Sequence, residues 1–431
     1  MLNYVTADEA VKLINPGERV FIHSTSVPQT LVNAMCRRSE ELKGTYIYSA
    51  FILGDAVWGR PEHRENFIIN SFFIGDNLRK TVKEGYGQYI PSFLGTIPTY
   101  FRSGEIPLDT VLLNVSEPDE HGYCSLGVGL DLTVSAAECA KKIIAQINPN
   151  IPRTFGDGRI HSSRFAACVK ADDGLVELSF GAPTEIEQKI GENVASLVPN
   201  GATLQIGVGG IPNAAMSALR DHKHLGLHTE ALTEGSVELI ECGAIDNSRK
   251  VIERGVSVAT LILGSKKLYD YVNNNPSVLM KDVAWTNNPW VIGQNPDVMA
   301  INSALEVDIT GQICADSIGT YIFSGFGGQH DFMYGAMLSP GGKAIIALPA
   351  ATNSGQSKIS SVLAPGAGVV TTRAQAQYIV TEYGIAYLKG KNLAERAKAM
   401  ISIAHPSARE ALEREAAERY GRAFLNIMHR D

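Results

Sequence analysis

Two glycine-rich segments in the second half of the chain have residue types that can bind an anion. The first is Gly207-Val208-Gly209-Gly210, which follows the short apolar run 203–206 and precedes Ile211 and Pro212. Glycines let a backbone approach a ligand, and a loop that opens a helix presents unpaired N–H groups to a phosphate or an oxyanion. The dinucleotide-binding pattern GxGxxG is not met, because Pro212 occupies a required glycine position. The residues alone fit an anion-binding loop or a tight turn.

The second glycine loop spans residues 324–332 and carries Gly327 and Gly328. It follows a strand-like run at 320–323, so it could offer backbone donors or simply reverse the chain. Two such loops in one half of the chain favour a functional role for both.

Glu230, in the segment LGLHTEALTEG at 225–235, is the candidate for covalent chemistry. We expect it at the end of the strand that follows the first glycine loop, and ligands of open parallel sheets bind beyond the carboxyl ends of strands. Glu234 and Glu238 follow at helical spacing and are predicted to be solvated. Spacing alone leaves open whether Glu230 is catalytic or solvated.

The elements that must position these residues alternate between strands and helices. Helical patterns occupy 184–197 and 392–404. This alternation predicts an α/β fold with a largely parallel sheet. The strand-like runs are VFI at 20–22, TVLLNV at 110–115, TLQI at 203–206, VATLIL at 258–263 and AIIALP at 344–349.

An internal repeat relates residues 16–35 to residues 200–219 at a constant offset of 184. The shared plan is a turn, a short strand, a loop, a proline (Pro28 or Pro212) and a helix, with proline suited to the first helical turn. A single long repeat indicates two related domains, although two unrelated β-loop-α units could match by chance.

The predicted domain boundary follows the segment SFGAPTE at 179–185. Gly181 and Pro183 interrupt the secondary-structure pattern before them, and Thr184 with Glu187 can cap the helix that follows. The predicted domains are therefore 1–183 and 184–431.

Composition excludes several classes of protein. A net charge of −7 argues against a broad contact with nucleic acid or an anionic membrane. We expect no signal peptide, and no apolar run is long enough to span a bilayer. The six cysteines are scattered without a CxxC pair, a pattern typical of ordinary thiols. We therefore expect a cytoplasmic protein. The HxH pair His222 and His224 is predicted to be a solvated helix end, so no metal site is expected.

Motifs along nearly the whole chain resemble those of the acetyl-CoA hydrolase/transferase family. The resemblance implies two related open α/β domains (the CoA-transferase-like, NagB/RpiA-like fold) with the active site between them. The motifs are SEPDEHGYCSLGVGLDLT at 116–133, NPNIPRTFGDGRIH at 148–161, VGGIPNA at 208–214, HTEALTEG at 228–235, GQNPDVMAINSALEVD at 293–308, SGFGGQHDF at 324–332 and the segment from 381 to 406.

The same resemblance implies roles for individual residues. Glu230 is the nucleophile of the HTE-type motif. The loop Val208, Gly209, Gly210, Ile211 and Pro212 contacts coenzyme A and helps to form an oxyanion hole. Gly327 and Gly328 of the second loop and Leu305 near the thioester are further contacts to coenzyme A.

The implied reaction is a ping-pong transfer of CoA between a short-chain acyl-CoA and a free carboxylate through a glutamyl-CoA thioester. The substrates implied are 4-hydroxybutyrate or butyrate with acetate, no permanently bound cofactor is needed, and a homodimer is expected. A strongly raised pKa of Glu230 would oppose the mechanism, because the nucleophile must be ionised. Alternatives are an acyl-CoA hydrolase on the same scaffold, which the sequence cannot separate from a transferase, and a non-enzymatic ligand sensor, against which the HTE motif argues.

Overall fold

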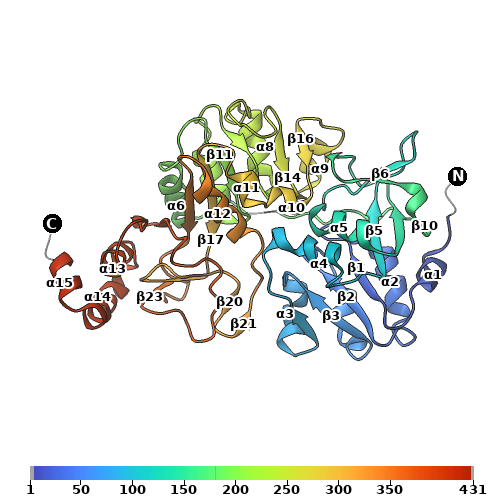
Figure 1. Cartoon of the computed structure of the whole chain (residues 1–431), viewed down its shortest axis with the longest axis horizontal. Helices are drawn as coiled ribbons and strands as arrows, with labels where there is room; N and C mark the ends of the chain where they lie inside the picture. Colours follow the sequence, from blue (N-terminus) through green and yellow to red (C-terminus); the bar gives the residue numbers. More distant parts are fainter. Residues whose placement is uncertain (1–3, 180, 429–431) are drawn as a thin grey trace.

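The computed structural model describes residues 4–179 and 181–428. The first half of the chain forms one α/β unit at the right of Figure 1, and the second half forms the centre and left of the molecule. The two described ends of the chain lie at opposite ends of the long axis (Figure 1).

A seven-stranded sheet organises the first half, and all of its neighbouring strands are parallel. Its central strands are buried, as the apolar run TVLLNV predicts, because helices cover both faces of such sheets. The strand order is β10 (Ala167–Lys170), β7 (Lys142–Ile147), β5 (Thr110–Val115), β1 (Arg19–Ile22), β2 (Thr45–Ser49), β3 (Phe67–Ser71) and β4 (Gly87–Tyr89). The helices include α2 (Gln29–Arg37), α3 (Asp76–Lys83), α4 (Ile97–Ser103) and α5 (Asp131–Cys139).

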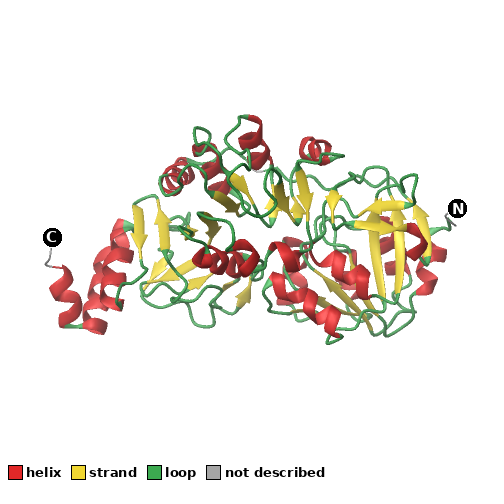
Figure 2. Cartoon of the chain, turned by 45° about the horizontal axis from the view of Figure 1, so that its top comes forward, coloured by secondary structure: helices red, strands yellow, loops and turns green. Residues whose placement is uncertain are grey.

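A six-stranded sheet organises the second half and is parallel except at its last strand. Its order is β12 (Gly226–Leu227), β11 (Thr203–Ile206), β17 (Val298–Ser303), β22 (Lys343–Ala347), β24 (Tyr378–Thr381) and β25 (Gly384–Tyr387). The helices include α6 (Glu185–Ala195), α7 (Gly210–Ala218), α8 (Glu234–Glu241), α12 (Gln329–Leu338), α13 (Leu393–Ser402), α14 (Pro406–Tyr420) and α15 (Arg422–Met428). The last three helices lie beyond the strands at the left of Figure 2.

The internal repeat has a counterpart in the topology of the two sheets. Strands β1 and β11 are offset by 184 residues, as the sequence predicted. β1 lies between β5 and β2, and β11 lies between the corresponding strands β17 and β12. The helix starts differ, because Pro28 immediately precedes α2 whereas Pro212 is the third residue of α7.

The capping box predicted at the start of the second half is present. The Thr184 hydroxyl accepts from the Glu187 N–H, and the Glu187 carboxylate accepts from the Thr184 N–H. This cap fixes where α6 begins. The division into domains 1–183 and 184–431 stays a prediction.

The predicted single strand at 258–263 is instead two short strands, β14 (Ser257–Ala259) and β15 (Leu261–Ile262). The break falls at Thr260. The N–H groups of Thr260 and Leu261 both donate to the carbonyl of Glu230. They are therefore not available for the hydrogen-bond ladder of one continuous strand. The interruption therefore ties this chain segment to the candidate nucleophile.

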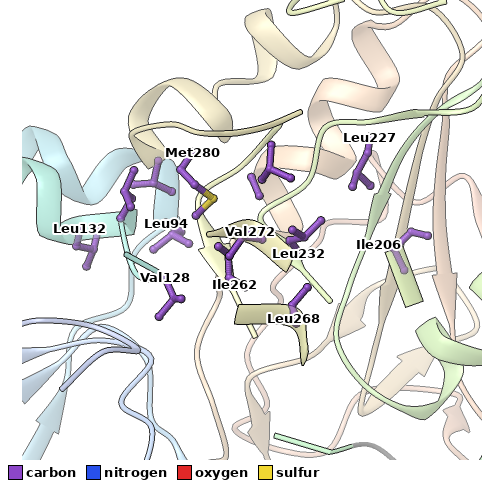
Figure 3. Packing of buried hydrophobic residues seen from close by; sticks show 14 of the residues in the cluster. Leu94, Val128, Leu132, Ile206, Leu227, Leu232, Ile262, Leu268, Val272 and Met280 are labelled. Atoms are coloured by element: carbon purple, nitrogen blue, oxygen red, sulfur yellow. The ribbon is translucent and has the colours of Figure 1, made fainter. Parts of the chain in front are cut away.

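The two halves share backbone pairing and one hydrophobic core. Strand β8 (Phe155–Gly156) of the first half pairs in parallel with β16 (Val278–Met280) of the second. Figure 3 shows Val128 and Leu132 of the first half near Ile262 and Met280 of the second, and all four belong to one buried cluster. A site between the halves is thus held by a continuous core.

Candidate active site

Glu230 lies in a bend immediately beyond β12. Because β12 pairs in parallel with β11, the carboxyl ends of both strands meet at one edge of the sheet. The first glycine loop leaves β11 at that same edge. The predicted position of Glu230, at a strand end facing this loop, is therefore what the structure shows.

The two residues before Glu230 hold its bend from both sides. The Nε2 atom of His228 lies 2.8 Å from the carbonyl oxygen of Thr286, the last residue of α10 (Val283–Thr286). The hydroxyl of Thr229 lies 3.3 Å from the carbonyl oxygen of Ile206, the last residue of β11. Both side chains are buried, and burial lowers the pKa of His228 to about 4, so its ring is neutral. The HT pair thus fixes the backbone that carries the carboxylate.

The two oxygens of the Glu230 carboxylate have different surroundings. Oε2 accepts a hydrogen bond of 2.9 Å from Nδ2 of Asn287, and the N–H of Gly328 donates to the same carboxylate. A Cβ atom at position 328 would lie 1.9 Å from Oε2, so only glycine permits this approach. Oε1 lies 3.9 Å from the place of a Cβ atom on Gly327, which lines the cavity described below. Asn287 thus holds the Oε2 side of the carboxylate, and Oε1 lies on the side of Gly327.

Burial raises the pKa of Glu230 to about 7, although the hydrogen bonds from Asn287 and Gly328 oppose the shift. Because a strongly raised pKa would oppose attack by an ionised carboxylate, this shift works against the implied mechanism, and it follows from packing depth, which the amino-acid sequence does not report. A pKa near neutrality still leaves a substantial ionised fraction at pH 7.

Asp331 is a second buried acid beside Glu230. Its Oδ2 accepts from the Gly95 N–H at 2.9 Å and lies 3.3 Å from Nδ2 of Asn287. Burial and the nearby charge of Glu230 raise the pKa of Asp331. The Asn287 amide therefore lies between two carboxyl groups, and Asp331 restrains it.

The first half of the chain holds the second glycine loop in place. The N–H of Leu94 donates to the Gly327 carbonyl at 3.0 Å, and the N–H of Ile74 donates to the Ser324 carbonyl at 2.9 Å. The Phe326 N–H donates to the Tyr89 hydroxyl at 3.1 Å. The loop that approaches Glu230 is thus positioned across the boundary between the halves.

The first glycine loop reaches the site only in part. Gly207 and Val208 line the cavity described below, whereas Gly209, Gly210, Ile211 and Pro212 do not. Gly209 caps α7 with a positive φ of 132°. At Gly210 a Cβ atom would lie 2.0 Å from Glu187, so this glycine serves the packing of α6 on α7.

A cavity of about 600 Å³ opens in front of Glu230 and is lined by both halves. Gly327 and Gly328 line the cavity, whereas Leu305 does not. Leu305 lies two residues beyond the lining residue Ser303, and its N–H donates to the Cys314 carbonyl. The first half contributes Phe51, Ile52, Leu53, Gly54, Phe73, Gly75, Asp76, Asn77, Arg79 and Leu178, and the second contributes Gln205, Ile206, Ala231, Leu261, Leu263, Asn302, Ala315, Phe326 and Gln329 besides the residues already named.

Sequence reasoning missed Asn287, Asp331 and the first-half aromatics Phe51 and Phe73. Asp331 does lie within the quoted motif SGFGGQHDF, whereas Asn287 carries no local signal beyond the end of a short helix. Within residues 4–179 and 181–428, no three His, Cys, Asp or Glu side chains are grouped as metal ligands, and no helix is both long and apolar enough to cross a bilayer.

Comparison with known proteins places this site in a family. The model of the acetyl-CoA hydrolase/transferase N-terminal domain matches residues 3–178, and that of the C-terminal domain matches residues 264–416. The 4-hydroxybutyrate coenzyme A transferase of Clostridium kluyveri is 44% identical over 96% of this chain and 97% of its own. A CoA transferase of Fasciola hepatica, named for succinyl-CoA with acetate and for propanoyl-CoA with succinate, is 46% identical over 96% of this chain and 87% of its own.

A solved structure agrees with the sequence matches. RipA from Yersinia pestis superposes with a TM-score of 0.90 at 33% identity and covers 97% of each chain. The fold and the site define an enzyme of the CoA-transferase class. The chain belongs to the acetyl-CoA hydrolase/transferase family.

Proposed function

We propose that the protein exchanges CoA between a short-chain acyl-CoA and a free carboxylate by a ping-pong mechanism through a thioester on Glu230. The acyl groups proposed are 4-hydroxybutyrate or butyrate with acetate. The observation that supports this most directly is the setting of the Glu230 carboxylate, with Oε2 held by Asn287, a further donor in the Gly328 N–H, and Oε1 beside the cavity-lining Gly327.

The first half-reaction uses the free oxygen. Oε1 of ionised Glu230 attacks the carbonyl carbon of the acyl-CoA, the carbon–sulfur bond breaks, and the products are a mixed anhydride and the CoA thiolate. The thiolate then attacks the Glu230 carboxyl carbon, and the bond from that carbon to Oε1 breaks. The first carboxylate leaves with Oε1, and Glu230 becomes a glutamyl-CoA thioester. A covalent intermediate divides a difficult exchange into easier steps.

The held oxygen serves the thiolate step. When sulfur attacks the glutamyl carbon, negative charge develops on Oε2, which already accepts from Asn287 and lies beside Gly328. Preorganised donors at a developing oxyanion are worth about 10²–10³ in rate per donor. A second carboxylate reverses the steps and leaves as the new acyl-CoA.

The other predicted site residues are proposed to contact coenzyme A. Gly207, Val208, Gly327 and Gly328 line the cavity and are proposed to contact the thioester end of the acyl-CoA. Contact with coenzyme A stays a prediction for the five residues that do not line the cavity, which are Gly209, Gly210, Ile211, Pro212 and Leu305. With the cavity as it is lined here, these residues would act on the substrate indirectly.

Covalent labelling tests the proposal. The protein is incubated with acetyl-CoA without an acceptor, reduced with borohydride and mapped by peptide mass. We expect modification of Glu230 and loss of exchange in Glu230→Ala. Glu238→Ala is the matched control, because Glu238 pairs with Arg220 on the surface. Label on another carboxylate would contradict the assignment, and CoA release that does not depend on added acetate would favour the hydrolase.

A further inference from the structure

We infer that the first copy of the internal repeat serves the second, and that His23 is a positioning residue that holds the backbone of Glu230 through two intervening chain segments. The inference rests on the proposed function, in which Glu230 is the nucleophile. It goes beyond that function because it gives a role to a first-half loop that does not line the cavity.

The two copies of the repeat carry different residues at corresponding places. Residues 23–26 (His-Ser-Thr-Ser) follow β1 in the first half, and residues 207–210 (Gly-Val-Gly-Gly) follow β11 in the second. Gly207 and Val208 line the cavity, whereas residues 23–26 do not. Each of the residues 23–26 is at most 2% exposed. The first copy of the loop therefore acts inside the protein and not at the cavity.

His23 forms hydrogen bonds through both of its ring nitrogens. Nδ1 accepts from the backbone N–H of Asn114 at 3.1 Å, and Nε2 lies 2.8 Å from the carbonyl oxygen of Gly129. Because a backbone N–H can only donate and a carbonyl can only accept, the ring is neutral and carries its proton on Nε2. Burial lowers the pKa of His23 to about 4, which agrees with this state at neutral pH. His23 thus joins β5, which contains Asn114, to the chain segment around Gly129.

Gly129 lies against the first-copy loop on one side and against the second half of the chain on the other. A Cβ atom at position 129 would lie 2.3 Å from the carbonyl oxygen of Ser24, so any side chain there would push the two segments apart. Gly129 also forms an antiparallel bridge with Leu261 of β15. The neighbouring residues Val128 and Ile262 lie close together (Figure 3), and the Ile262 N–H donates to the Val128 carbonyl at 2.9 Å.

The second-half segment in this pairing contacts Glu230 directly. The Leu130 N–H donates to the Thr260 carbonyl at 3.0 Å. Thr260 and Leu261 in turn donate their own N–H groups to the Glu230 carbonyl at 3.0 and 2.9 Å. A path of backbone and hydrogen bonds therefore runs from the His23 ring to the residue that carries the attacking carboxylate.

This path determines where the Glu230 carboxylate can lie. The Glu230 carbonyl accepts both hydrogen bonds, so a shift of residues 260–262 moves the backbone of Glu230 with them. A displacement of about 1 Å can cost on the order of 10²-fold in rate. His23 therefore influences the reaction through Glu230, without touching the substrate.

Two amide variants separate the two hydrogen bonds of the ring. A glutamine side chain places its Nε2 near the position of the imidazole Nε2, so His23→Gln keeps the donor to Gly129 and loses the acceptor for Asn114. An asparagine side chain places its Oδ1 near the position of Nδ1, so His23→Asn keeps the acceptor for Asn114 and loses the contact with Gly129. Each variant lacks one buried hydrogen bond, so each is the matched control of the other for Tm.

We expect kcat to fall about 10- to 100-fold in His23→Asn and by less than about threefold in His23→Gln. The Kd for free CoA should be unchanged in both, because the ring lies outside the cavity. Amide hydrogen exchange at Thr260 and Leu261 should be faster in His23→Asn only. His222→Asn, which removes a ring contact of 3.0 Å with the Val198 carbonyl elsewhere, should leave kcat unchanged.

The outcomes separate this inference from the proposed function. Wild-type kcat in folded His23→Asn overturns the inference, and so does an equal loss of kcat in both variants, because that pattern marks a general role in packing. If His23→Asn does not fold, a fall of more than about threefold in folded His23→Gln overturns it, and a smaller fall with wild-type exchange at Thr260 and Leu261 supports it. Absence of the borohydride label on Glu230 of the wild-type protein overturns the proposed function, and the inference with it.

Discussion

Nδ2 of Asn287 lies 2.9 Å from Oε2 of Glu230 and holds the nucleophile by one oxygen. The hydrogen bond lowers the pKa of Glu230, against the larger effect of burial, which raises it. Asn287 thus links the orientation of the carboxylate to its ionisation, and both can be measured.

Replacing Asn287 with Ala should reduce exchange and shift its pH dependence. Without this donor the pKa of Glu230 rises, so the acid limb of kcat/KM moves to higher pH. At pH 7 we expect a loss of about 10²–10³-fold, because one oxyanion donor is also removed. The pH–rate profile distinguishes this from a folding defect. Asn288→Ala, at a residue that caps the next helix instead, is the control, and an unshifted limb in Asn287→Ala would contradict the assignment.

Asp331→Asn should shift the same limb in the opposite direction. The charge of Glu230 raises the pKa of Asp331. Because repulsion between two carboxylates is mutual, removing the Asp331 charge should lower the pKa of Glu230. The acid limb should therefore extend to lower pH. Measurement of kcat/KM from pH 5 to 8 tests this sign, and a limb displaced upward would show that Asp331 acts mainly by restraining Asn287.

Gly328→Ala should abolish activity without unfolding the protein. The added Cβ would lie 1.9 Å from Oε2 of Glu230 and 2.2 Å from Nδ2 of Asn287, so the carboxylate must move. A displacement of about 1 Å can cost on the order of 10²-fold. Gly174→Ala, where a Cβ meets nothing within 4 Å, is the matched control for turnover and for Tm. Wild-type turnover in Gly328→Ala would exclude this close approach.

Gly209→Val should lower turnover through the backbone rather than by touching substrate. Gly209 has a φ of 132°, which valine adopts only with strain. The start of α7 and the adjoining cavity-lining residue Val208 would therefore shift. We expect at least about a tenfold fall in kcat/KM by analogy with other small displacements of a site. Full activity in a folded variant would remove this loop from the mechanism.

Glu230→Gln should stabilise the fold at alkaline pH. The pKa of Glu230 in the folded protein is raised to about 7, so its ionisation costs stability as pH rises between about 4.5 and 7. Glutamine has no such cost. We expect a gain on the order of 1 kcal/mol at pH 8 and none at pH 4.5, read from denaturant unfolding at both values. A gain independent of pH would place the effect in packing instead.

The sequence by itself determined the alternation of strands and helices, the repeat and the position of Glu230 beyond a strand end. Strands β5 and β11 have the predicted limits, since short β-branched apolar runs have few alternatives when buried on both faces. The position of Glu230 could be predicted because its motif is local: His228 and Thr229 adjoin it in the chain and fix its bend.

Only the tertiary structure decided what surrounds the nucleophile. Asn287, Asp331 and Phe51 come from segments far apart in the chain, and no local periodicity relates them to Glu230. The pKa of Glu230 likewise depends on how much protein excludes water around the carboxylate, which is a property of packing. Even the break at Thr260 arises from a long-range bond, because the Glu230 carbonyl competes for N–H groups that propensity alone would assign to one strand.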